Sequence, residues 1–155
     1  MQENLSRKKW YNKPYANTKV TVQETLSQIK GLLMKYNVIG IQDTQYQDII
    51  QIRFVLEDNG EQIPFEFTIK LPSNKDEKSI ESQQRQYMRA YYYYMKSKIE
   101  MIKDFGIKAF KNEFMGERLL KLPNGQLRTL GQVIKDQEEK LSYVENLFLP
   151  LKEGV

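Results

Sequence analysis

The sequence contains no cysteine and no histidine. Without cysteine it can form no disulfide, no Cys-ligated zinc site and no thiol nucleophile. Without histidine it can form no Ser-His-Asp triad and has no imidazole base or histidine metal ligand. No apolar run approaches the ~18 residues that a membrane-spanning helix needs, and the first ten residues lack the apolar segment of a signal peptide. These absences predict a cytoplasmic protein with no membrane association.

The sequence also lacks the common motifs of catalysis. Its glycines are scattered and match neither G-x-x-x-x-G-K nor G-x-G-x-x-G, so no phosphate-binding loop is expected. Glu66 and Lys70 are spaced Glu-x-x-x-Lys, whereas a metal-dependent nuclease places these residue types two apart on one side of a strand. Glu100, Asp104 and Glu113 would converge only if two helices fold against each other. We therefore predict a protein that is not an enzyme and has no cofactor or metal.

The positive charge that is present has an uneven distribution. The 155 residues carry 24 Lys+Arg and 20 Asp+Glu, a net charge of +4. Residues 1–19 contain five cations and one anion, so this segment accounts for the whole excess, and residues 20–155 are neutral overall. We predict a basic N-terminal arm over residues 1–20 and a single domain over residues 21–155.

A β-hairpin is the clearest local signal. Asn59-Gly60 favours a type I′ turn, because both central residues must adopt positive φ. Folding about this turn places eight apolar residues on one face, in the pairs Leu56/Ile63, Phe54/Phe65, Ile52/Phe67 and Ile50/Ile69. On the other face Arg53 is paired with Glu66 and Gln51 with Thr68. A short strand over 38–42, followed by a polar loop over 43–47, completes a predicted sheet of about three strands.

Four helices are predicted around this sheet. Thr21 and Glu24 form a capping box that starts a helix over about 21–36, with Asn37 as its left-handed stop. A long helix over about 79–104 ends before Gly106, and a short one covers 107–115. A turn at Pro123-Asn124-Gly125 precedes a last helix over about 129–146. Its buried face would contain Leu130, Val133 or Ile134, Leu141 and Val144, and the apolar tail 147–151 would pack on the body. The fold class is α+β, a small antiparallel sheet packed against a long central helix and two to three others.

The long helix carries two stripes. The first is apolar and is expected to pack on the sheet; it contains Met88, Tyr92, Met95, Ile99 and Ile102. The second runs through Arg85, Arg89, Tyr93, Lys96, Glu100 and Lys103. One interpretation is an anion-binding ridge, with phosphates at the cations and a base stacked on a tyrosine. The other is an ordinary solvated helix face with intrahelical ion pairs.

The arm has a similar pair of interpretations. Cations alternate with aromatic residues in the segment Arg7, Lys8, Lys9, Trp10, Tyr11 and Lys13. This composition is typical of flexible nucleic-acid-binding arms, whose affinity depends strongly on salt. It is also compatible with a solubilising tail, or with a strap that Trp10 and Tyr15 hold against the core.

Four segments in order, RQYMRA at 85–90, KSKIE at 96–100, FKNEFM at 110–115 and LPNG at 122–125, resemble a widespread family of small phage and prophage proteins. The family pattern is R-x-R-W-R-A, K-A-K-L-E, F-E-x-E-F-L and L-P-D-G, and the stretch from Asn12 to Val20 resembles its opening. Met88, Ser97 and Ile99 are among the positions that depart from the pattern. The resemblance implies a mobile-element origin and raises interest in the positions that belong to the shared pattern: Arg89, Lys96, Glu100, Glu113 and Phe114. It implies no activity.

The sequence thus supports two hypotheses. The first is a non-enzymatic phage-type accessory protein of the host cytoplasm that binds nucleic acid through the arm and the ridge. The second is an interaction module without nucleic acid, either a homo-oligomer built on the tyrosine run 91–94 and the apolar tail, or an inhibitor of a host protein. Salt separates them, because only nucleic-acid binding weakens steeply as salt rises.

Overall fold

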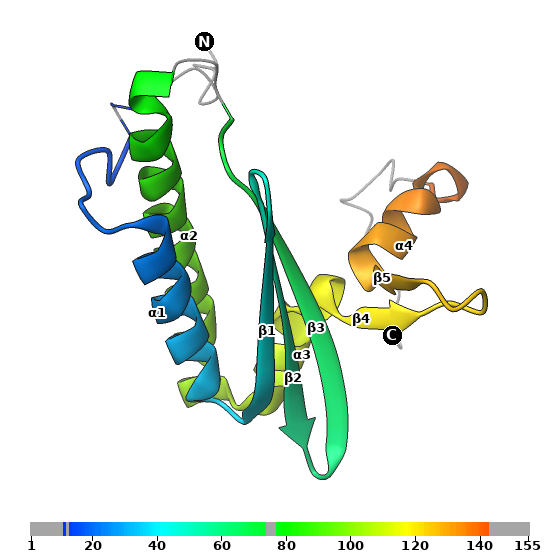
Figure 1. Cartoon of the computed structure of the whole chain (residues 1–155). Helices are drawn as coiled ribbons and strands as arrows, with labels where there is room; N and C mark the ends of the chain where they lie inside the picture. Colours follow the sequence, from blue (N-terminus) through cyan, green and yellow to red (C-terminus); the bar gives the residue numbers. More distant parts are fainter. Residues whose placement is uncertain (1–10, 12, 74–76, 143–155) are drawn as a thin grey trace, which may run out of the picture.

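The protein has an α+β fold in which two long helices lie along a three-stranded antiparallel sheet (Figure 1). The computed structural model describes residue 11, residues 13–73 and residues 77–142. The elements follow in the order α1 (Val22–Met34), β1 (Val38–Tyr46), β2 (Ile49–Asp58), β3 (Glu61–Lys70), α2 (Glu77–Phe105), α3 (Ile107–Glu113), η3 (Met115–Glu117), β4 (Leu119–Lys121), β5 (Leu127–Thr129), α4 (Leu130–Asp136) and η4 (Glu138–Lys140).

The predicted hairpin is formed by β2 and β3, and its register is confirmed. All four apolar pairs and both polar pairs are Cα partners as predicted. The turn residues Asn59 and Gly60 have φ of 50° and 82°, as a type I′ turn requires. Every one of the eight apolar side chains is buried. On the opposite face Arg53 donates to Glu66 at 2.7 Å. The turn and the alternating pattern together therefore determine this part of the fold.

Strand β1 is longer than predicted, and the expected loop over 43–47 is wrong. The strand runs to Tyr46 and the chain turns at Gln47, whose φ is 55°. Asp43 is paired with Ile52 and Gln45 with Ile50, which places both polar side chains toward the helices. There Lys30 of α1 contacts Asp43 at 2.8 Å, and Gln23 of α1 donates to Gln45 at 2.9 Å. The polar end of β1 is thus stabilised as a strand by the polar side chains of α1, although its composition predicted a loop.

The helices α1, α2 and α3 begin and end close to their predicted positions. Thr21 caps α1 by accepting the backbone N–H of Glu24 at 3.1 Å, and Asn37 has the predicted left-handed φ of 53°. Gly106, at φ 80°, separates α2 from α3. Helices α1 and α2 lie side by side (Figure 1). Four residues of the predicted apolar stripe of α2 are buried, and Tyr92 is partly buried against them.

One hydrophobic cluster connects the sheet with α1, α2 and α3. Its centre is aromatic: the Phe54 ring is stacked on Phe65 and Phe67 at centroid distances of 5.2 Å. Phe110 of α3 makes edge-to-face contacts with Phe54 and Phe65, and Phe114 makes one with Phe67. Each such pair adds about 0.5–1.5 kcal/mol to the burial of its rings. These contacts hold α3 on the sheet and fix the chain that follows it.

The C-terminal part differs from the prediction. The turn at 123–125 closes a small hairpin of β4 and β5, which was not predicted, and the last helix ends at Asp136 rather than near 146. No residue of α4 is buried, and Ile134 and Leu141 are exposed, so the predicted buried face is wrong over the described residues. Val144 and the tail 147–151 lie outside them. The small hairpin of β4 and β5 packs beside β3, where Phe65 forms an isolated β-bridge with Arg118.

Candidate nucleic-acid interface

The last residues of the basic arm are attached to α2. Gln86 donates from its amide to the carbonyl of Pro14 at 3.1 Å. The Tyr15 ring is stacked on Tyr93 at a centroid distance of 5.0 Å and an interplanar angle of 14°. Tyr15 has a φ of 67°, which is unusual for a non-glycine residue and turns the chain there. Arg7, Lys8, Lys9 and Trp10 lie outside the described residues, but the point at which the arm meets the body is defined.

A groove of about 550 Å³ lies between this attachment and α2. Two buried carboxamides, those of Gln83 and Gln86, line it, and the exposed Tyr87 ring forms one wall. The remaining lining residues are Lys13, Pro14, Tyr15, Pro72 and Ala90. The groove therefore combines apolar and aromatic walls with amide groups and one exposed ammonium. Lys13 was predicted from the sequence, whereas Gln83, Gln86 and Tyr87 were not, because their convergence depends on how the arm folds back.

Arg89 does not lie on an exposed ridge. Its side chain is only 8% exposed, and its guanidinium donates to Gln28 at 2.5 Å and Thr25 at 3.3 Å, both on α1. Its Cζ also lies 4.5 Å from the centroid of the Tyr92 ring and 5.3 Å from that of Tyr93. The prediction of a continuous exposed ridge is therefore wrong at this position. Because α1 covers that side of α2, the guanidinium joins the two helices and supports the Tyr93 ring.

Arg85 is only partly available to a ligand. Its side chain is 26% exposed, and it lies 3.0 Å from Ser82 and 3.9 Å from the Glu81 carboxylate. It lines a groove of about 250 Å³ together with Thr21, the N-cap of α1, and Val22, its first residue. A helix N-terminus and a guanidinium both favour an anion, but the nearby carboxylates of Glu81 and Glu24 reduce that preference. Arg85 remains a weaker candidate for phosphate than the basic arm.

Tyr93 and Lys96 remain accessible. The Tyr93 ring is 42% exposed beyond its stack with Tyr15, and Lys96 is paired with Glu100 at 3.8 Å in the predicted i, i+4 arrangement. Such exposed pairs contribute about 0–1 kcal/mol, so Lys96 can exchange its partner for a phosphate at low cost. The predicted site residues thus separate into an accessible set (Lys13, Tyr93 and Lys96), a partly available one (Arg85) and a structural one (Arg89).

A second polar cluster lies between α2 and η3. Lys98 is bonded to Glu113, and its ammonium lies 5.5 Å from the Tyr94 ring centroid. Burial, and then the charge of Glu113, raise the pKa of the Glu117 carboxyl, and burial raises the pKa of the Tyr91 phenol. The hydrogen bond to Glu113 raises the pKa of Lys98. Glu113 was a candidate residue in the sequence, but its pairing with Lys98 was not predicted, because it requires α3 to fold back on α2.

The cluster contains two carboxylates, too few for a metal centre of the usual kind. Across the described residues no group of three or more acidic side chains is arranged to hold a metal ion. The same residues contain no helix long and apolar enough to cross a bilayer.

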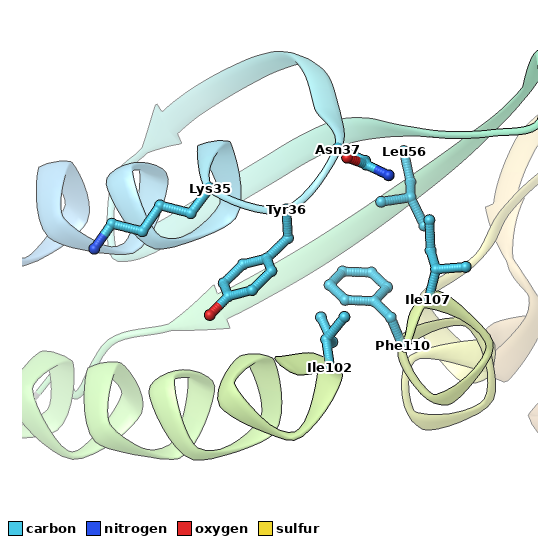
Figure 2. Close-up of a pocket in the computed structure, with 7 residues that line it drawn as sticks. All are labelled: Lys35, Tyr36, Asn37, Leu56, Ile102, Ile107 and Phe110. Carbon is cyan, nitrogen blue, oxygen red and sulfur yellow. The ribbon is translucent and has the colours of Figure 1, made fainter. Parts of the chain in front are cut away.

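Figure 2 shows a small pocket of about 170 Å³ at the end of the core. It lies between the chain that leaves α1 and the junction of α2 with α3. Leu56 and Phe110, which line it, are each 1% exposed, and the Lys35 side chain points away from it (Figure 2). These two side chains and Ile102 belong to the hydrophobic core, so the floor of the pocket is formed by core packing. We therefore regard the pocket as a packing crevice and assign it no binding role.

Comparisons with known proteins found no match to a protein-family model, a curated protein or a solved structure. The resemblance to small phage proteins therefore stays a prediction.

Proposed function

We propose that this protein is a non-enzymatic accessory protein that binds nucleic acid where its basic arm meets α2. One observation carries the proposal: Gln86 and Tyr93 fix the base of the arm beside a groove with aromatic walls. The arm contains five of the protein's cations within nineteen residues. In the sequence, Arg7, Lys8 and Lys9 precede Lys13, which lines the groove, by four to six positions.

The basic arm and the aromatic groove together suit nucleic acid, because binding it uses two kinds of contact, one to phosphates and one to bases. Cations neutralise phosphates and release counterions, which supplies most of the affinity without regard to sequence. Exposed aromatic rings stack on bases, at about 1–3 kcal/mol per base. Tyr15, Tyr87 and Tyr93 are each more than 40% exposed beside the arm. The neutral charge of residues 20–155 means that the body alone attracts phosphate weakly, so the arm is essential.

The test measures binding of labelled DNA by fluorescence anisotropy at several salt concentrations, for the full chain and for a variant lacking residues 1–13. We expect the affinity of the full chain to fall at least tenfold between about 50 and 200 mM salt, with a slope set by the number of phosphates neutralised. The truncated variant should lose most of this dependence. An unchanged salt slope would rule out the arm as the electrostatic contact.

A second candidate function, homo-oligomeric assembly, is favoured by one face of α2. Tyr87, Tyr94, Met101 and Phe105 recur at intervals of seven, seven and four residues and are all exposed, Phe105 by 69%. Aromatic residues and methionine are enriched at protein interfaces. Light scattering over a range of concentrations tests this candidate. A dimer that persists in high salt and is disrupted by Met101→Lys would support it, whereas a monomer at every concentration would exclude it.

The cytoplasmic location and the possible host-protein partner remain predictions from the sequence alone.

A further inference from the structure

We infer that the groove between the arm and α2 holds one unstacked base, so that the protein prefers single-stranded to double-stranded nucleic acid. This inference rests on the proposed function and adds the class of ligand. It depends on the shape and lining of the groove rather than on the charge of the arm.

The groove has the size and the chemistry of a base-binding site. Its volume, about 550 Å³, lies within the ~300–1,000 Å³ range of small-molecule sites. Tyr87 and Tyr15 supply rings, and Pro14 and Pro72 supply rigid apolar surface, all of which can contact the flat face of a base. A carboxamide offers a donor and an acceptor side by side, the pattern found along base edges. Gln83 and Gln86, 6% and 7% exposed, line the groove with two such groups, and a base edge would share them with their partners Ser79 and Pro14.

The surrounding contacts make this groove a preformed site. Gln86 is held by Pro14 and Gln83 donates to Ser79 at 2.8 Å, so neither carboxamide has to be ordered when a ligand arrives. The Tyr15–Tyr93 stack fixes the outer wall. Lys13 is exposed at the rim, within reach of the phosphate attached to a bound base. A preformed site loses less conformational entropy on binding than a flexible surface does.

A duplex cannot use these features in the same way. Its bases are stacked on both faces, so a ring wall has no free base face to contact, and extruding a base costs a few kcal/mol. A single strand exposes its base faces without that cost. Duplex DNA would therefore bind only through contacts between its phosphates and the arm. Substitutions in the lining of the groove would not change its affinity.

The experiment compares the affinities of fluorescein-labelled oligothymidylate and of a duplex of equal length, by anisotropy at fixed salt. The full chain is compared with Tyr87→Ala, and with Tyr46→Ala as a control. Tyr46 lies on β1 and is 69% exposed, against 41% for Tyr87, so its replacement removes an even more accessible ring away from the groove. Melting temperatures of all three proteins establish that they are equally folded.

We expect the single strand to bind at least tenfold more tightly than the duplex. Tyr87→Ala should weaken single-strand binding by roughly five- to 150-fold, the range of a lost base stack, and should leave duplex binding within twofold. Tyr46→Ala should change neither. Equal affinity for both forms, or an unaffected Tyr87→Ala variant, would overturn the inference and leave the proposed function standing. Failure of the full chain to bind either form at low salt would overturn both.

Discussion

Replacing Arg89 tests the finding that this residue joins two helices rather than contacting a ligand. Arg89→Ala would remove the hydrogen bonds to Gln28 and Thr25 and the cation–π contacts with Tyr92 and Tyr93. A hydrogen bond to a charged group contributes about 1.5–3 kcal/mol, and a cation–π contact about 0.5–2 kcal/mol. Because removing the buried guanidinium also removes its desolvation cost, we expect a net loss near 3 kcal/mol in the free energy of unfolding.

Urea denaturation followed by circular dichroism measures this loss as a lower transition midpoint with an unchanged slope. Lys96→Met, which removes an exposed cation on the same helix, is the matched control and should change stability by less than about 0.5 kcal/mol. Arg89→Lys keeps the charge, and wherever it remains folded it should bind DNA within twofold of the original chain. A loss below about 0.5 kcal/mol for Arg89→Ala would refute the structural role, and a selective loss of DNA affinity in Arg89→Lys would restore Arg89 as a direct contact.

The raised pKa of Glu117 means that its folded state binds a proton more tightly than the unfolded chain does, so stability should fall as pH rises above about 4.5. Glu117→Gln should flatten this profile and raise the melting temperature at neutral pH; a profile identical to that of the original chain would contradict the assignment. Gly31→Ala in α1 should stabilise the protein by up to about 1 kcal/mol, because a Cβ there meets nothing within 4 Å. Gly131→Ala in α4 should give no such gain, since its Cβ would lie 3.0 Å from the carbonyl oxygen of Gly116; equal melting shifts for both variants would show that this close approach does not matter.

The β2–β3 hairpin could be predicted to the residue because its determinants are local. Asn59 and Gly60 fix the turn, and a strand has a side-chain period of two, so only one register buries the apolar set. The C-terminal end of α2 could be predicted for a similar reason, because Gly106 directly follows an uninterrupted apolar stripe. These signals need no information about distant parts of the chain.

The burial of Arg89 could not be predicted in the same way. A spacing of four residues places Arg85 and Arg89 on one side of the helix, but it does not say whether another helix covers that side. The partners of Arg89 on α1 are more than 60 positions away in sequence. The strand pair β4–β5 escaped prediction for a different reason: each strand has three residues, too few to show a period. The groove was missed because it depends on a left-handed turn at Tyr15, a residue type that rarely adopts that conformation.

The attachment of β4 beside β3 has a consequence for self-association during folding. An open sheet edge offers a row of unpaired backbone groups on which another chain can add a strand. Here Phe65 bridges to Arg118, and the adjacent Pro64 has no N–H to donate. The edge is therefore interrupted at two successive residues near the centre of β3. While the C-terminal hairpin is still forming, Pro64 alone interrupts this edge, and the bridge to Arg118 adds a second interruption once the hairpin has packed beside β3.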